Sequence, residues 1–190
     1  MATGFGGKPV RKLSGGELRT RPYVAAATEG SVLCVGEFVE LDGAIDASTG
    51  LPTVKLATAG NALLGVVVGF QPDPTDPFNG DFRKASTRRV VHVCDDPDAI
   101  FQIQEDAVGG SVSAANVAVS ANADIVVAAG TSTTRISGTM LDSSTAVTTT
   151  ANLKIVGILR DDVNAAAQSG GAVLEVMIFE HALKTADSQS

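Results

Sequence analysis

His92 and Cys94 are the side chains in this sequence best suited to covalent chemistry. They lie two residues apart in the stretch VHVCDDPDAIFQIQED, residues 91–106, so in a β-strand they share one face. An imidazole beside a thiol can draw off its proton and produce a nucleophilic thiolate. A thiolate needs an electropositive setting, whereas Asp95 and Asp96 follow directly and oppose a further negative charge. We therefore do not expect a cysteine nucleophile.

The aspartates of the same stretch, Asp95, Asp96 and Asp98, raise the alternative of a metal site. A calcium loop places acidic residues at alternate positions, with a glycine at the bend and a distant bidentate glutamate, and this spacing is missing around Pro97. Zinc sites built from Cys and His usually contain short-range pairs such as CxxC or HxxxH. The two cysteines and two histidines of the chain form no such pair. We expect neither a metal nor another cofactor.

A structural interpretation explains more of this stretch. Pro97 fixes its own backbone for a turn and pushes Asp96 towards an extended conformation. Aspartate side chains accept hydrogen bonds from the free N–H groups of such turns. The segments on either side alternate between apolar and polar residues, as strands do. Asp95, Asp96, Pro97 and Asp98 are therefore predicted to form a structural turn between two strands.

The remaining sequence offers no other catalytic constellation. GxSxG, HExxH and the phosphate-loop motif GxxxxGK[ST] are absent. The segment GGKP near the N-terminus has a lysine, but it lacks the spacing and the preceding strand of a phosphate-binding loop. Tryptophan is absent and tyrosine occurs once, so the rigid aromatic surface that often lines ligand pockets is scarce. We expect a protein that is not an enzyme.

The elements that carry these residues are predicted to be short β-strands. Strand-like runs are separated by Gly, Pro, Asn and Ser/Thr clusters, a pattern typical of sandwiches and barrels. The longest apolar run, residues 62–70, indicates a buried central strand and is far shorter than the ~20 residues of a membrane span. Residues 161–168 could form one or two helical turns. We expect an all-β fold, a sandwich or barrel of short, mainly antiparallel strands with at most one or two short helices.

The first 22 residues differ from the rest in charge and texture. They contain five basic residues and one acidic residue, a net charge of +4, whereas the other 168 residues contain nine basic and twenty acidic residues, a net charge of −11. Five glycines, two prolines and no hydrophobic periodicity predict a flexible, extended arm. The expected organisation is a basic arm, a β-rich body and a disordered polar tail, at residues 1–22, 23–185 and 186–190.

Four stretches of the body resemble a group of head decoration, or cement, proteins of tailed bacteriophages. These stretches are ATAGNALLGVVVGFQPDP, FRKASTRRVVHVCDDPDAIFQIQED, LDSSTAVTTTANLKIVGILRDDVN and AVLEVMIFEHAL. The resemblance covers residues 23–183, and its most specific part runs from Val91 to Gln104. It implies a β-rich protein, encoded beside the major capsid protein, that binds the outer capsid surface, often as an oligomer. The basic arm lies outside the resemblance.

These observations predict a capsid decoration protein that binds across coat-subunit boundaries and stabilises the DNA-filled head. The expected partners are the major capsid protein and further copies of the chain, with a trimer favoured over a dimer. Removal of the arm is expected to leave the body folded and to weaken attachment, which should also weaken as salt rises. The expected capsid-binding residues are the five cations of the arm, Lys8, Arg11, Lys12, Arg19 and Arg21.

The expected location is the outer surface of the virion, after synthesis in the host cytoplasm. The N-terminus lacks the apolar run of a signal peptide, and reduced cysteines and no membrane contact are expected. An acidic body repels phosphate, which argues against direct binding of nucleic acid. The alternative function is a virion carbohydrate-binding module for host adhesion. Sugar sites usually stack on exposed aromatic rings, for which only Tyr23 and seven phenylalanines are candidates.

Overall fold

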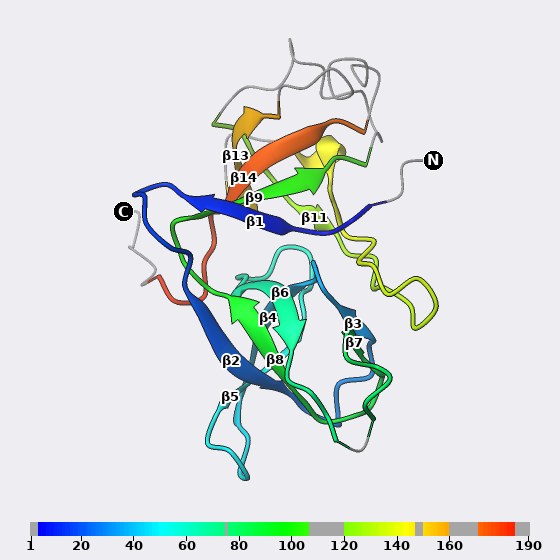
Figure 1. Cartoon of the computed structure of the whole chain (residues 1–190). Coiled ribbons are helices and arrows are strands. Elements are labelled where there is room, and N and C mark those ends of the chain that lie inside the picture. The colour runs from blue at the N-terminus through cyan, green and yellow to red at the C-terminus, as the bar shows by residue number, and fades with distance from the viewer. Residues whose placement is uncertain (1–3, 75, 107–119, 147–149, 160–170, 185–190) are drawn as a thin grey trace.

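In the computed structural model the chain folds mainly into β-strands joined by turns and loops (Figure 1). The structure describes residues 4–74, 76–106, 120–146, 150–159 and 171–184. Within these ranges the only helical segment is one 3-10 turn, Ser143–Thr145. The all-β prediction is therefore confirmed. The helical turns predicted for residues 161–168 lie outside the described residues, and no described helix is long and apolar enough to cross a membrane.

Five strands close into a barrel, which occupies the lower half of the molecule in Figure 1. Neighbouring strands are antiparallel except for β2 and β5, which run parallel. Val91 and Val93 lie in the barrel core and are fully buried, which confirms the alternation predicted for this strand. Around the barrel the strands are β2 (Thr20–Ala25), β5 (Pro52–Leu56), β4 (Phe38–Ile45), β6 (Gly65–Phe70) and β8 (Arg89–Cys94).

Five further strands form an antiparallel sheet above the barrel in the same view. In order across the sheet they are β1 (Lys8–Lys12), β9 (Ala99–Gln104), β14 (Val173–Ile178), β13 (Leu153–Ile158) and β10 (Asn122–Ala123). Phe101 and Ile103 face the core, while Gln102 and Gln104 are half-buried, as their alternation predicts. Two short pairs complete the fold, β3 (Leu33–Cys34) with β7 (Phe82–Arg83) and β11 (Ile125–Val126) with β12 (Met140–Leu141).

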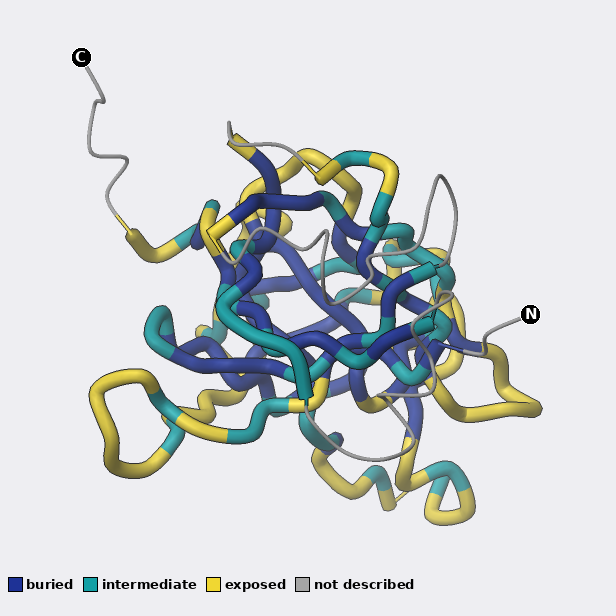
Figure 2. The backbone as a smooth tube through the Cα atoms, turned by 90° about the horizontal axis from the view of Figure 1, so that it is seen from above, coloured by how far each residue is buried: buried dark blue, intermediate teal, exposed yellow. Residues whose placement is uncertain are grey.

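A shared hydrophobic core joins the barrel to the sheet. Phe38 and Val66 of the barrel belong to the same buried cluster as Phe101, Ile103 and Val176 of the sheet. The ring centroids of Phe38 and Phe101 lie 5.9 Å apart. Figure 2 shows the buried backbone concentrated in the middle of the molecule, with exposed loops around it. Because burial of apolar surface is the main driving force of folding, this common core makes the two halves depend on each other.

The N-terminal segment does not form the predicted flexible arm. Residues Lys8–Lys12 are β1, which pairs with β9 at the edge of the sheet, and Thr20–Ala25 are β2, which pairs with β5 and β8 in the barrel. The irregular sequence has a physical reason, because β1 is a short edge strand with Pro9 and a bulge, and such strands need no regular alternation. Residues 1–3 and the predicted tail at 186–190 lie outside the described residues.

The glycines of this segment serve close packing. Gly36 has a φ of +92°, and a Cβ placed on it would lie 2.7 Å from the carbonyl oxygen of Phe5. Gly6 also has a positive φ, of +74°, and faces the carbonyl of Gly36. The N–H of Gly7 donates to the same carbonyl at 2.8 Å. The N-terminal segment is thus fixed against the corner between β3 and β4, where no side chain would fit.

Candidate functional site

The turn at residues 95–98 connects the two halves of the molecule. Strand β8 of the barrel ends at Cys94, and strand β9 of the sheet begins at Ala99. The N–H of Asp98 donates to Asp96 Oδ1 at 3.1 Å, and the N–H of Ala99 donates to the Asp96 carbonyl at 3.0 Å. A turn between two strands is therefore present, as predicted. The two strands belong to different sheets, so the turn is a joint and not the tip of a hairpin.

Asp95 is fully buried at this joint. Its carboxylate accepts hydrogen bonds from Arg19 Nε at 2.9 Å and Arg21 Nε at 2.5 Å, and from the Tyr23 hydroxyl at 2.6 Å. Burial by itself raises the pKa of Asp95, but the hydrogen bonds from Tyr23 and the two arginines outweigh it and hold the pKa below its ordinary value. Burial, with the bond to Asp95, raises the pKa of Tyr23 to about 12. These four residues are called the Asp95 cluster below.

Two further cations of the N-terminal segment are paired within the chain. Lys12 Nζ lies 2.9 Å from Asp96 Oδ2. Arg11 Nη2 lies 2.7 Å from Glu175 Oε2 on β14. With the two arginines of the Asp95 cluster, four of the five cations expected to bind the capsid form ion pairs within the chain. Lys8 is the one of the five that forms no ion pair with any residue the structure describes.

The environments of Cys94, His92 and Cys34 do not favour nucleophilic chemistry. Cys94 is 1% exposed, and burial raises the pKa of its thiol, which disfavours a thiolate. His92 is half-buried on the barrel wall, opposite Pro22 and Gly69 of the neighbouring strands. Cys34 is buried too, and burial raises its pKa to about 11. In the described part of the chain, no three His, Cys, Asp or Glu side chains are grouped to hold a metal ion.

A second buried carboxylate, that of Glu37, fastens the loop between β11 and β12 to the barrel. It accepts hydrogen bonds from the N–H of Gly130 at 2.6 Å, Ser137 Oγ at 2.8 Å and Thr139 Oγ1 at 3.1 Å. Burial raises the pKa of Glu37, and the three donors only partly oppose that rise. These four residues are called the Glu37 cluster below. The sequence does not predict this cluster, and its one signal there is a glutamate on the same strand face as the buried Val39.

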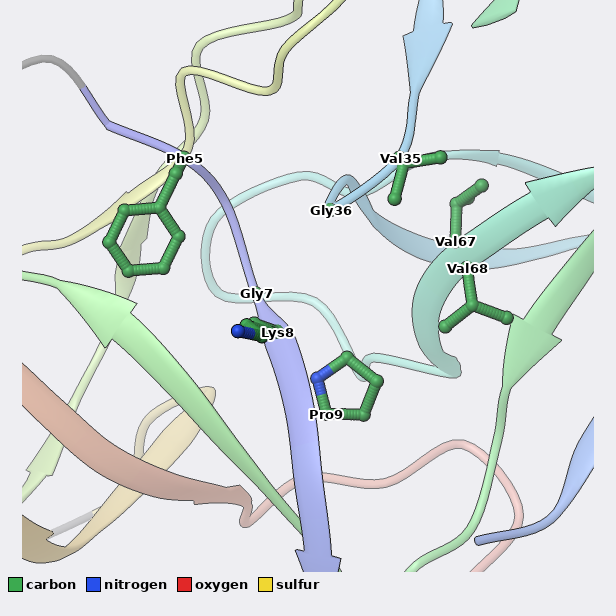
Figure 3. Close-up of a pocket in the computed structure, with 8 residues that line it drawn as sticks. All are labelled: Phe5, Gly7, Lys8, Pro9, Val35, Gly36, Val67 and Val68. Atoms are coloured by element: carbon green, nitrogen blue, oxygen red, sulfur yellow. The ribbon is translucent and has the colours of Figure 1, made fainter. Parts of the chain in front are cut away.

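An apolar hollow of about 430 Å³ opens where the N-terminal segment crosses the barrel (Figure 3). Gly7 and Gly36 line it, and a Cβ built on either would lie 2.7 Å from the Phe38 ring or from the Phe5 carbonyl oxygen, so the N-terminal segment approaches the barrel closely at these two glycines. Among the described residues that line it, Lys8 is the only charged one. The lining residues, which define the apolar hollow below, are Phe5, Gly7, Lys8, Pro9, Val35, Gly36, Val67 and Val68.

Exposed apolar side chains extend the surface of this hollow. Val35 forms a parallel β-bridge with Ile136, in the loop that the Glu37 cluster fastens. The two side chains are 44% and 54% exposed. Single exposed hydrophobic residues are common on proteins, but a continuous apolar surface around a hollow is typical of an interaction site.

Comparisons of the chain with protein-family models, with curated proteins and with solved structures find no match. The described residues include two clusters around buried carboxylates, which connect distant parts of the chain, and an apolar hollow at the surface.

Proposed function

We propose that the chain is a head decoration protein of a tailed bacteriophage and binds the outer surface of the capsid. The resemblance of residues 23–183 to such proteins supports this, most specifically through Val91–Gln104. The observation that carries the proposal is the place of this segment in the fold. It contains most of β8, the turn at residues 95–98 and all of β9, so it is the joint between barrel and sheet. The segment most similar to decoration proteins thus connects the barrel to the sheet. A likeness at such a position indicates that the two kinds of protein share a rigid body, and it does not point to a shared reaction centre.

A rigid body suits a protein that acts by adhesion. The shared core and the Asp95 cluster fix the barrel to the sheet, and the Glu37 cluster fixes a long loop to the barrel. A surface that is already in its binding shape loses little conformational entropy when it docks. Modest contacts then suffice for stable attachment.

Stabilisation of the head follows from linkage. A protein that binds the assembled shell and not its dissociated subunits stabilises the shell at every occupied site, by about 2.7 kcal/mol at a free concentration of ~100 Kd. Repeated over a whole head, this energy opposes the outward pressure of packaged DNA. A homo-oligomer would bind several coat subunits at once and gain avidity.

The proposed attachment does not depend on a cationic arm. Among the described residues, four of the five N-terminal cations have carboxylate partners and Lys8 has none. We therefore expect attachment to change little with salt, because a contact made mainly by apolar side chains is screened weakly. This expectation replaces the weakening of attachment at higher salt that the sequence predicts.

The test is co-sedimentation of the purified full chain with heads assembled from the coat protein encoded beside it. We expect saturable binding to expanded heads at a fixed ratio of chain to coat subunit, and little binding to unassembled coat subunits. Decorated heads should release DNA at a higher temperature than bare heads. Heads that bind none of the chain at saturating concentration would contradict the proposal.

A further inference from the structure

Beyond the end of β14 the chain returns from the sheet to the barrel. The N–H of Leu63 donates to the Glu180 carbonyl at 2.8 Å, and the N–H of Ala182 donates to the Leu63 carbonyl at 2.8 Å. His181 lies between these two residues in the chain and forms a parallel β-bridge with Leu63. Residues 179–184, called the C-terminal segment below, therefore fasten the sheet to the barrel just before β6.

His181 is the buried side chain at the centre of this segment, with an exposed fraction of 4%. Its Nδ1 accepts a hydrogen bond from the N–H of Leu183 at 3.1 Å, so the neutral ring carries its hydrogen on Nε2. Nε2 is buried too and has no hydrogen-bond partner among the described residues. The site therefore fits a neutral imidazole and provides no hydrogen-bond acceptor from the described residues for a cationic one.

A second proton on His181 would disturb this arrangement in two ways. It would occupy Nδ1, which could then no longer accept the hydrogen bond from Leu183, and two N–H groups would face each other. The ring would also carry a positive charge in the interior, which is costly without a partner. A protonated ring is more stable in water, and the segment that carries it must leave Leu63 to bring it there.

The charged groups around His181 come from three parts of the fold. Lys184 in the C-terminal segment and Arg19 in the N-terminal segment disfavour a further positive charge. Asp95 and Asp96 of the turn favour it, but both carboxylates are already engaged in ion pairs. The loop between β5 and β6 carries no charged residue. Burial, together with Lys184, lowers the pKa of His181 to about 4.

The lowered pKa makes the closed arrangement of the segment less stable in acid. When the segment is open, His181 lies in water and titrates near its ordinary pKa of about 6.5. The closed arrangement is therefore favoured in full above about pH 6.5, and it loses this advantage as the pH falls towards 4. Each pH unit in this window raises the ratio of open to closed segment about tenfold, so the whole window raises it about a hundredfold or more.

We propose that the C-terminal segment is an acid-sensitive latch, which stays closed while His181 is neutral and opens when His181 takes up a proton. Opening would uncover Leu63, which is fully buried and belongs to the core shared by barrel and sheet. The turn at residues 95–98 and the rest of that core would still join the two halves. The Asp95 cluster loses its stabilising effect only below about pH 4, so the two responses are separable. The inference concerns the purified protein and stands independently of capsid binding.

Amide hydrogen exchange between pH 4 and pH 7 tests the latch. The N–H groups of Leu63 and Ala182 lose their partners when the segment opens, so their protection factors should fall about a hundredfold from pH 6.5 to pH 4. The N–H of Ile155, inside the sheet, should stay more protected throughout. His181→Asn, whose Oδ1 can replace Nδ1 as the acceptor, should remove the pH dependence. His92→Asn is the matched control and should retain it.

The imidazole resonances of His181 give a second readout that needs no variant. The midpoint of their NMR titration should lie well below about pH 6.5, the value of an exposed histidine. The proposal fails if His181 titrates near pH 6.5 while Ala182 stays protected, or if His181→Asn keeps the wild-type pH dependence. It fails as well if Ile155 exchanges as fast as Ala182, because the opening would then involve the whole fold and not the segment.

Discussion

The Asp95 cluster and the Glu37 cluster both bury a carboxylate completely, yet they hold it in opposite ways. Asp95 meets two guanidinium groups and a phenol, all from the N-terminal segment and β2. Glu37 meets one backbone N–H and two hydroxyl groups, none of them charged. As a result, the pKa of Asp95 lies below its ordinary value and the pKa of Glu37 lies above it.

This difference matters because each cluster joins parts that are distant in sequence. Asp95 lies at the joint of barrel and sheet, and its partners begin the barrel. Glu37 fastens one loop. Separation of a buried ion pair leaves a charge without a partner in the interior, whereas separation of neutral donors costs less. The charged joint should therefore tolerate substitution least.

Removal of residues 1–22 should have the largest effect. The deletion takes away β1, the first half of β2 and both arginines of the Asp95 cluster, so Asp95 would be buried without its cations. The combined loss approaches the whole stability of a typical domain, about 5–15 kcal/mol. We expect no cooperative unfolding transition when circular dichroism is followed through a urea titration. A wild-type transition in the truncated protein would restore the flexible-arm interpretation.

Asp95→Ala should lower the free energy of unfolding by about 3–5 kcal/mol, because three hydrogen bonds to a charged acceptor are lost and the buried Tyr23 hydroxyl is left without its partner, whereas the half-exposed arginines regain water. Urea denaturation of the full chain measures this. Asp98→Ala is the matched control, since its side chain lies in the same turn and makes no hydrogen bond to a described residue, and it should cost less than about 0.5 kcal/mol. Equal losses in the two variants would show that the turn itself, and not the charged joint, sets the stability.

Glu37→Ala should cost less, about 1–3 kcal/mol, because it leaves neutral buried donors without an acceptor. Glu37→Gln keeps one carbonyl oxygen and should recover part of that loss. The measurement is again the free energy of unfolding in urea. A loss from Glu37→Ala larger than that from Asp95→Ala would reverse the comparison between the two joints.

The sequence predicted which faces of β8 and β9 are buried, but not which distant segments meet. Val91 and Val93 could be assigned to one face because a strand with one buried side must alternate. Pro97 made the turn predictable. The Asp95 cluster could not be derived, because Arg19 and Asp95 are 76 residues apart and the sequence shows two opposite charges without their pairing.

The flexible arm predicted for residues 1–22 was wrong for the same reason, because the sequence does not show which distant segments meet. Glycine-rich composition is common to flexible segments and to segments packed too tightly for side chains. The contact of Gly6 with Gly36 decides between them, and only the fold brings these residues together. The apolar hollow depends on the same packing, so it could not be predicted from the sequence either.

The contributions of the Asp95 cluster and the Glu37 cluster to the free energy of unfolding should change with pH in opposite directions. The lowered pKa of Asp95 gives a stabilisation that is present above about pH 4 and is lost as the pH falls through the folded-state pKa. The raised pKa of Glu37 gives a stabilisation that is present below about pH 4 and is lost as the pH rises through the folded-state pKa of Glu37. A tenfold difference between the acid dissociation constants of the folded and unfolded states corresponds to about 1.4 kcal/mol of stability.

Unfolding free energies measured in urea at several pH values check this for wild type, Asp95→Asn and Glu37→Gln. The advantage of wild type over Asp95→Asn should shrink towards acid pH. Its advantage over Glu37→Gln should shrink towards neutral pH. If both differences follow the same trend with pH, the two carboxylates are not held in opposite ways.

The smallest effect is expected at the exposed ion pair between Arg11 and Glu175. The side chain of Arg11 is 53% exposed and that of Glu175 is 21% exposed, so water and salt screen their attraction. Arg11→Ala, Glu175→Ala and the double variant form a cycle, and urea denaturation should give a coupling energy below about 1 kcal/mol. A coupling energy as large as the loss expected from Asp95→Ala would mean that burial of the carboxylate does not determine how much an ion pair stabilises this fold. The Arg11–Glu175 pair and the pairs of Arg19 and Arg21 with Asp95 all join a guanidinium to a carboxylate. A small coupling at Arg11–Glu175 would therefore show that the N-terminal segment stabilises the fold mainly through the Asp95 cluster, whose carboxylate is buried.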